Sequence, residues 1–239
     1  MNVARGGIGR ALLGSGLLAV TLLGGAGGYG IGLLTSAASE VTGQAVPLGL
    51  VTPTTPVTTQ TPTKPPRTAT PDNTKPLDPD DLSYQTRTAY SEQVVRSRIT
   101  VNVPRNWWLS HSDPPQYSWF SDPTRKRKLR IEAGFSVTRP PAASMAERVG
   151  ILEALSADRL LTILDQKIDA KARTATLTYT YIPENETSLR RIMVRWVATD
   201  DSGNVGVELS SIGLPQDKDA ILDVLDHASE SVTRSDSEL

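Results

Sequence analysis

Residues 176–198 read TLTYTYIPENETSLRRIMVRWVA and contain the clearest strand pattern of the chain. Apolar residues occupy every second position of 177–181 and alternate with threonines, as in a strand with one buried face. After a turn at 183–188, a second alternation runs through 191–198. Two such segments joined by a short connection pair antiparallel, so this stretch predicts a β-hairpin.

Similar alternations lie on both sides of this hairpin. The further strand candidates are at 99–103, 117–120, 129–137 and 205–209. A tight turn at 200–204 joins the hairpin to the last of them, which extends the antiparallel arrangement by one strand. In the candidate at 129–137 the apolar positions are expected to be buried, and Lys128, Arg130 and Glu132 are expected to face water.

Two amphipathic helices interrupt the strands. Ser144 and Glu147 have the spacing of a capping box, in which each side chain bonds a free backbone N–H, and they predict a helix that starts there. A second helix is predicted after Pro215, where Asp217 and Asp219 suit the positive end of a helix dipole. Each helix has a single apolar face, which a sheet would cover.

Strands in hairpins and helices segregated between them define the α+β class. We expect one folded domain at 83–235, built as an antiparallel sheet of about six strands sandwiched by helices. A short tail is expected at 236–239. A domain of this length buries enough apolar surface to fold without staples.

The first 82 residues contain no comparable pattern. Residues 11–34 carry no charged side chain and are long enough to cross a bilayer, which needs about 20 apolar residues. They form either a retained transmembrane helix after a cytoplasmic segment at 1–10, or part of a signal peptide cleaved after Ala38. Residues 35–82 are rich in threonine and proline, which predicts a disordered linker.

The distribution of positive charge orients the chain in both interpretations. Arg5 and Arg10 precede the apolar segment, and no lysine or arginine follows until Lys64. Positively charged flanks stay in the cytoplasm, so the rest of the chain is predicted to lie outside. We expect a single-pass protein of the cell membrane, held through 11–34 with its C-terminal domain extracytoplasmic, or a secreted protein after cleavage near Ala38.

Charge and composition argue against several functions. The chain has 25 lysines and arginines against 26 acidic residues, so nucleic acid is not an expected partner. Without cysteine it has no thiol nucleophile and no cysteine-bound metal. Neither of its two histidines, His111 and His227, lies near a Gly-x-Ser-x-Gly motif. We predict no catalytic residue, no metal site and no cofactor.

Several short motifs resemble one family of domains. They are Val103-Pro104-Arg105-Asn106-Trp107, Phe120-Ser121-Asp122-Pro123, Leu129-Arg130-Ile131, the strand at 176–181 and a late helix. Over most of 88–235 they resemble the PsbP-like, or LpqN-type, domain, which occurs in exported actinobacterial proteins. The resemblance implies an antiparallel sheet between helices and a non-enzymatic role through protein contacts or a small ligand. The chain lacks the lipid-anchored cysteine of the lipoproteins in this family.

The densest run of charge follows a predicted turn at 122–124. It consists of Arg125, Lys126, Arg127, Lys128 and Arg130. Basic side chains at the end of a hairpin prevent edge-to-edge pairing of sheets. They also attract anionic lipid head groups or wall polymers, so a contact with an anionic surface is the second interpretation.

Aromatic residues gather around the loop at 110–116. Trp107 and Trp108 are adjacent, so in an extended chain they point to opposite sides and only one of them is buried. We expect Trp107 in the core and Trp108 at the surface, either as ordinary packing or as part of a binding hot spot. The candidate partner- or ligand-binding residues are Trp108, His111, Tyr117 and Trp119.

These features predict a non-enzymatic extracytoplasmic binding or interaction module, tethered to the membrane, in a cell-envelope or type VII secretion-related assembly. Its partner would be an envelope protein or a small ligand. A secreted or envelope hydrolase and a ligand-sensing domain are the alternatives.

Overall fold

The structure, a computed structural model, describes residues 67–239. The predicted cytoplasmic segment at 1–10, the membrane or signal segment at 11–34, the cleavage site after Ala38 and the linker up to residue 66 lie outside the described residues. Among the helices of residues 67–239, none has the length and apolar character needed to cross a bilayer.

Ten strands and two α-helices make up this part of the chain. The strands are β1 (Tyr84–Glu92), β2 (Arg96–Pro104), β3 (Trp108–His111), β4 (Tyr117–Ser121), β5 (Lys128–Ala133), β6 (Thr162–Asp169), β7 (Thr174–Tyr181), β8 (Arg190–Val197), β9 (Val207–Gly213) and β10 (Thr233–Ser237). The helices are α1 (Pro141–Glu153) and α2 (Lys218–Ser231). Short 3-10 helices lie at Pro79–Asp81, Ala157–Arg159 and Pro215–Asp217.

The strands form two antiparallel sheets. The large sheet has seven strands in the order β3-β4-β5-β9-β8-β7-β6, and the small sheet has the order β1-β2-β10. The hairpin predicted from residues 176–198 is β7 and β8, which pair from Thr174 opposite Val197 to Tyr181 opposite Arg190. The α+β class predicted from the sequence is confirmed, because antiparallel sheets and two segregated helices build the domain.

The second sheet was not expected, and the physical reason lies in its sequence. The positions of β1 that face the core are Gln85, Arg87, Ala89 and Ser91, so the strand has no apolar alternation. Arg87 compensates by stacking over the ring of Phe120, with 5.6 Å between the guanidinium carbon and the ring centroid. Because polar and small residues point inward, the rule of alternating hydrophobicity did not detect this strand.

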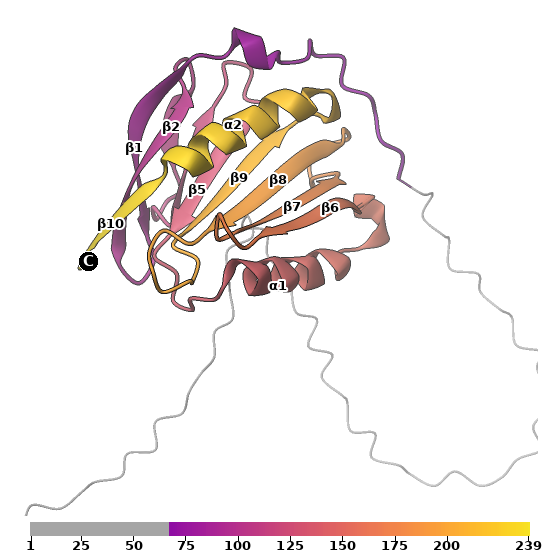
Figure 1. Ribbon diagram of the computed structural model, residues 1–239. Coiled ribbons are helices and arrows are strands. Elements are labelled where there is room, and N and C mark those ends of the chain that lie inside the picture. Colours follow the sequence, from indigo (N-terminus) through magenta and orange to yellow (C-terminus); the bar gives the residue numbers. More distant parts are fainter. Residues whose placement is uncertain (1–66) are drawn as a thin grey trace, which may run out of the picture. The chain divides into compact units, whose positions relative to one another are not determined.

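The helices cover opposite faces of the large sheet (Figure 1). Helix α2 packs against β2, β8 and β9, and it fills the space between the two sheets with five buried residues: Ala220, Ile221, Val224, Leu225 and Ala228. On the other face α1 packs against β7 and β8, where Met145 and Leu152 are buried. Two apolar cores result, one on each face of the large sheet.

Helix α1 begins earlier than the capping box predicted. Its first residue is Pro141, a favourable start because the missing N–H of proline is not needed there. Ser144 and Glu147 therefore lie inside the helix, and Glu147 forms an ion pair with Arg139 instead of a cap.

Both predicted boundaries of the domain also differ from the structure. Residues 67–82, assigned above to the linker, lie against the domain. Leu77 and Leu82 pack on the core that contains the buried side of α2. At the other end β10 pairs with β2 as far as Ser237, so half of the expected tail belongs to the small sheet. The composition of the linker is that of a disordered segment, but its last part has apolar and charged partners on the domain.

Candidate functional site

The register of the large sheet shows which side chains share a face. Residues that are directly opposite on neighbouring strands point to the same side, and so do residues two apart on one strand. Trp119 is opposite Ser110 on β3 and Arg130 on β5. The row continues from Arg130 through β9 to Val194 and Leu177, which belong to the core under α1. The side chain of Trp119 therefore lies on the α1 face.

Five of the candidates predicted from the sequence share this face. Trp108 is opposite Ser121, and Ser121 is opposite Lys128, while Tyr117 lies two residues from Trp119. We call this surface the aromatic face and define it as Trp108, Tyr117, Trp119, Lys128 and Arg130. Helix α1 packs on β7 and β8, and β9 and β5 lie between β8 and β4, so α1 does not pack on the strands that carry the three aromatic residues.

The aromatic face is arranged before any partner binds. The rings of Tyr117 and Trp119 lie 5.5 Å apart between centroids, and the guanidinium carbon of Arg130 lies 4.3 Å from the Tyr117 centroid. A cation over an aromatic ring is attracted by the electrons of its face, so Arg130 and Tyr117 hold each other in place. Trp108 is 39% exposed, whereas Trp107 is 2% exposed. This confirms the prediction that Trp107 lies in the core and Trp108 at the surface.

His111 does not join this surface. It is opposite Ser118 on the other face of the sheet, and its Nδ1 lies 2.7 Å from the Ser118 hydroxyl. That hydroxyl also donates to the carbonyl oxygen of Tyr90, so the contact connects the large sheet to β1. His111 is exposed, but it lies on the face of the sheet opposite to the other three aromatic candidates and contacts a residue that bonds the small sheet.

Beside the aromatic face lies a pair of buried glutamates that the sequence did not reveal. Glu132 and Glu208 are directly opposite on β5 and β9. Arg148 of α1 donates to both oxygens of Glu208 at 3.0 Å, and Trp196 Nε1 donates at 2.8 Å. We call Glu132 and Glu208 the carboxylate pair. The alternation at 129–137 predicted that Glu132 faces water. Sequence periodicity does not show that Arg148 of α1 extends to Glu208, the residue opposite Glu132.

Two like charges at this depth affect ionisation. Burial raises the pKa of Glu132 to about 7, with Arg130 acting in the opposite direction and Glu208 adding to the rise. Gln93 and Arg130 each donate to one oxygen of Glu132. Since every oxygen of the pair accepts a hydrogen bond from the protein, the pair is held closed rather than presented to a substrate.

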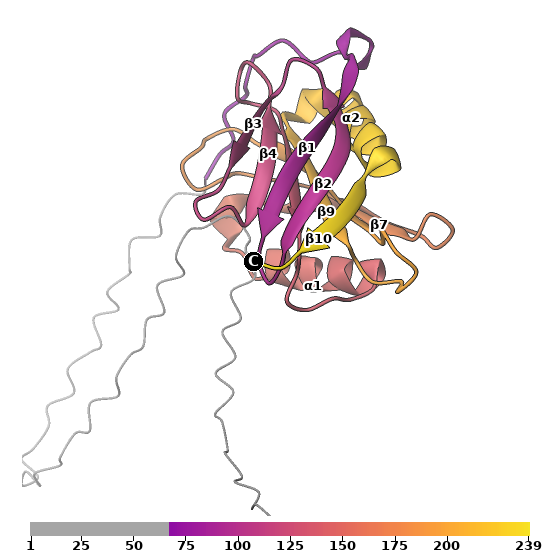
Figure 2. The same ribbon diagram turned by 90° about the vertical axis from the view of Figure 1, so that its left-hand side faces the viewer.

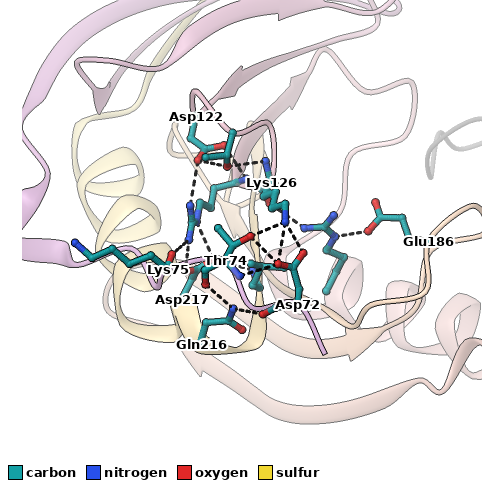
Figure 3. Close-up of polar contacts among 12 residues, drawn as sticks. Asp72, Thr74, Lys75, Asp122, Lys126, Glu186, Gln216 and Asp217 are labelled. Atoms are coloured by element: carbon teal, nitrogen blue, oxygen red, sulfur yellow. Dashed lines mark hydrogen bonds and ion pairs between the residues drawn. The ribbon is translucent and has the colours of Figure 1, made fainter. Parts of the chain in front are cut away.

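The predicted basic run is divided by the structure. Arg127 is buried, with its side chain 4% exposed, and it binds Asp217 through two hydrogen bonds of 2.8 Å. It also contacts Asp122 at 3.3 Å and donates to the carbonyl oxygen of Lys75 at 2.7 Å. Figure 3 shows how these groups converge from different parts of the chain. Arg127 is therefore not available to an anionic surface.

Lys126 extends the same cluster toward the N-terminal segment. Its ammonium group lies 2.7 Å from Asp72 Oδ2 and 2.5 Å from the hydroxyl of Thr74 (Figure 3). Hydrogen bonds from Lys126 and Thr74 hold the pKa of Asp72 well below its usual range. We call Asp72, Asp122, Lys126, Arg127 and Asp217 the clasp, because these residues fasten the N-terminal segment to the domain.

Asp217 is the centre of the clasp. Burial acts to raise its pKa, but hydrogen bonds from Arg127 and from the backbone N–H groups of Leu77 and Leu214 hold the pKa below its ordinary value. The sequence placed Asp217 at a helix start but gave no sign of its partners, which are 90 and 140 residues away.

The remaining basic residues separate in space. Arg125 is exposed in the turn, Lys128 is half-buried, and Arg130 lies over Tyr117. The structure thus does not gather Arg125, Lys126, Arg127, Lys128 and Arg130 into one basic surface. Within residues 67–239, no three histidine, aspartate or glutamate side chains gather as metal ligands would.

A shallow groove of about 420 Å³ lies on the opposite face, between α2 and the strands β6 to β8. Its central residue, Arg195, donates to Thr176, Asp226 and Ser229 at 2.6 to 3.0 Å. Because Arg195 already has these partners within the domain, the groove offers a weaker candidate for ligand binding than the aromatic face.

Comparisons with solved structures find similar folds, two of which are those of LpqN and Mog1p. No family model matches the chain, and no curated protein matches its sequence. LpqN, described as involved in cell envelope biogenesis of Mycobacterium tuberculosis, is similar with a TM-score of 0.39 and 18% identity, over 65% of this chain and 94% of LpqN. The Ran-binding protein Mog1p of Saccharomyces cerevisiae is similar with a TM-score of 0.42 and 10% identity, over 62% of this chain and 96% of Mog1p. LpqN is of the type that the sequence motifs resemble, but likenesses of this size carry no argument about function.

Proposed function

We propose that residues 67–239 form a non-enzymatic binding module whose aromatic face contacts a partner. One observation carries the proposal: the register brings Trp108, Tyr117 and Trp119 to one face of the sheet, next to Arg130, on strands that α1 does not pack against. Aromatic residues and arginine are enriched in interface hot spots, because they bury a large area at a small entropic cost.

The arrangement of the buried charges supports binding rather than catalysis. General acid–base chemistry needs a carboxyl group within hydrogen-bond reach of a substrate. Glu132 and Glu208 are 7% and 5% exposed, and protein donors occupy their oxygens. A hydrolase, the alternative function, would have to open this network before each turnover.

We further propose that the module acts outside the cytoplasm, tethered to the membrane of the cell envelope. The uncharged segment at 11–34 and the arginines before it support the tether. In an envelope or secretion-related assembly, a partner protein or a small ligand would meet the aromatic face. Removal of 11–34 should release the protein from the membrane fraction, and the mature N-terminus distinguishes a retained helix from cleavage near Ala38.

A photo-crosslinking residue tests the contact in the full chain within its own membranes. We expect a covalent adduct when the crosslinker replaces Trp108 and none when it replaces Tyr90, which is 41% exposed on the small sheet and serves as the matched control. Trp119→Ala should reduce the adduct formed at position 108. Equal adducts at 108 and 90 would contradict the proposal, as would turnover of ester, peptide or glycan substrates that disappears in Glu132→Gln.

A further inference from the structure

The two outer strands of the large sheet differ in how their free edges are protected. Along β6, Asp165, Lys167 and Asp169 place charges at the edge, and the register shifts between Ile163 and Asp165. Charges and bulges of this kind prevent another strand from pairing. The other outer strand, β3, reads Trp108-Leu109-Ser110-His111, with no lysine, acidic residue, proline or register shift.

The backbone groups that β3 turns outward follow from its pairing with β4. In an antiparallel pair, hydrogen-bonded and non-bonded positions alternate. The N–H of Ser112 donates to the carbonyl oxygen of Tyr117, so Ser110 and Trp108 also bond toward β4. The N–H and C=O groups of Leu109 and His111 therefore point away from the sheet. No backbone hydrogen bond from the rest of residues 67–239 reaches them, and Figure 2 shows β3 at the rim of the sheet.

We propose that β3 accepts an extended segment of a partner protein as an additional antiparallel strand of the large sheet. This inference rests on the proposed binding function and specifies how the partner is held. The main-chain groups of Leu109 and His111 provide four hydrogen bonds, which is how strand addition supplies affinity. Every second side chain of the added strand lies over the aromatic face next to Trp108.

The surroundings of β3 determine the chemistry of that segment. Apolar side chains at alternate positions fit the half-buried rings of Tyr117 and Trp119 and the exposed ring of Trp108. At the Trp108 end, Arg125 is exposed in the turn that follows Ser121, the residue opposite Trp108, and Lys128 begins the strand after that turn. An antiparallel strand has its C-terminal end there, so acidic residues are expected at the C-terminal end of the segment.

Amide hydrogen exchange in the full chain, held in detergent micelles, tests this inference residue by residue. The probe is a synthetic octapeptide of alternating valine and threonine that ends in two glutamates. In the free protein the amides of Leu109 and His111 should exchange quickly, while those of Trp108 and Ser110 exchange slowly. Addition of the peptide should slow exchange at Leu109 and His111 only. Ending the peptide in two lysines should weaken its binding about tenfold, since like charges then meet.

Two substitutions at one position separate the backbone from the side chain. His111→Pro removes an outward N–H that has no partner within the domain, and proline is tolerated at an outward-facing edge position. This substitution should weaken binding of the peptide about tenfold, because one hydrogen bond is lost and the proline ring clashes with an added strand. His111→Ala keeps the N–H and should bind within about twofold of the original protein.

Several results would overturn the inference. Slow exchange at Leu109 and His111 without peptide would mean that the edge is already covered by the chain itself or by a second copy. Absence of protection at saturating peptide, or equal binding by His111→Pro and His111→Ala in variants that keep the melting temperature, would also reject it. If these arms fail while the crosslink at position 108 persists, the aromatic face binds its partner without strand addition.

Discussion

The clasp and the carboxylate pair are both buried groups of charges, but they are balanced differently. In the clasp, Arg127 lies between two carboxylates, and Asp217 receives two backbone N–H groups in addition. In the carboxylate pair, two carboxylates are neighbours, and burial raises the pKa of Glu132 to about 7, so Glu132 is only partly ionised near neutral pH. Glu132 and Glu208 also have arginine partners, Arg130 and Arg148. The comparison teaches that such partners do not alone decide ionisation: burial and a second carboxylate directly opposite raise the pKa of Glu132, whereas Arg127 and two backbone N–H groups hold the pKa of Asp217 low.

The largest effect is expected from breaking the clasp at its centre. Arg127→Ala leaves Asp217 buried without its cation, which should reduce the free energy of unfolding by about 3 to 5 kcal/mol. Urea unfolding followed by tryptophan fluorescence measures this loss. Arg105→Ala, at an exposed position, is the control and should change stability by less than about 0.5 kcal/mol. A loss below about 1 kcal/mol for Arg127→Ala would contradict the central role of the pair.

The carboxylate pair should respond to pH in the opposite sense from an ordinary salt bridge. The pKa of Glu132 rises from 4.5 to about 7 on folding, so the folded protein binds the extra proton between these values. Stability therefore falls by about 3 kcal/mol as pH rises from about 4.5 to 7, and it levels off above that pH.

Glu132→Gln isolates this effect. The variant lacks the titrating group and does not lose this stability. Its unfolding free energy should therefore increase relative to that of the original protein as pH rises from about 4.5 to 7. Unfolding curves at pH 5, 6, 7 and 8 give that difference. A difference that does not change with pH would show that Glu132 ionises at its ordinary pKa.

A smaller effect is expected at the outer part of the clasp. Lys126 is 33% exposed in its pair with Asp72, so Lys126→Ala should cost only about 0.5 to 1 kcal/mol of global stability. Local release should be easier to detect, as faster proteolytic cleavage between residues 67 and 77. Lys128→Ala keeps the pair and should leave the cleavage rate unchanged; equal acceleration in both variants would reject a specific fastening.

The smallest effect on stability is expected outside both clusters. Trp108→Ala removes an exposed ring and should shift the free energy of unfolding by less than about 0.5 kcal/mol. Trp107→Ala, one residue away, empties a core position and should cost about 3 to 5 kcal/mol. Thermal unfolding of the two variants compares them directly, and a large loss for Trp108→Ala would move that residue from the contact surface into the packing.

Sequence periodicity predicted the parts of the fold that follow a local rule. The alternation at 177–181 gave β7, and the adjacent tryptophans gave one buried and one exposed ring. It did not predict β1, whose inward positions carry Gln85 and Arg87 instead of apolar residues. Such a strand is stabilised by contacts with distant residues, which a local pattern does not contain.

The candidate site was predicted in part for a similar reason. Spacing placed Trp108, Tyr117 and Trp119 near one another, and the register then brought them to one face. The sequence did not separate His111 from them, because that requires knowing the register of β3. It also treated neighbouring basic residues as one surface, although Arg127 turns inward to meet Asp217 from 90 residues away.

The clasp has a mechanical consequence. A force applied to the chain at Arg67 first meets the hydrogen bonds of Arg67 and Thr70 to the loop between β7 and β8, and then reaches Asp72 and Lys75. Through these two residues it passes to Lys126 and Arg127 before it reaches the first strand. The load is thus transferred to that loop, to the turn between β4 and β5 and to the start of α2, rather than to the end of β1. A pull along the linker would have to break several hydrogen bonds together before it could peel β1 from the small sheet.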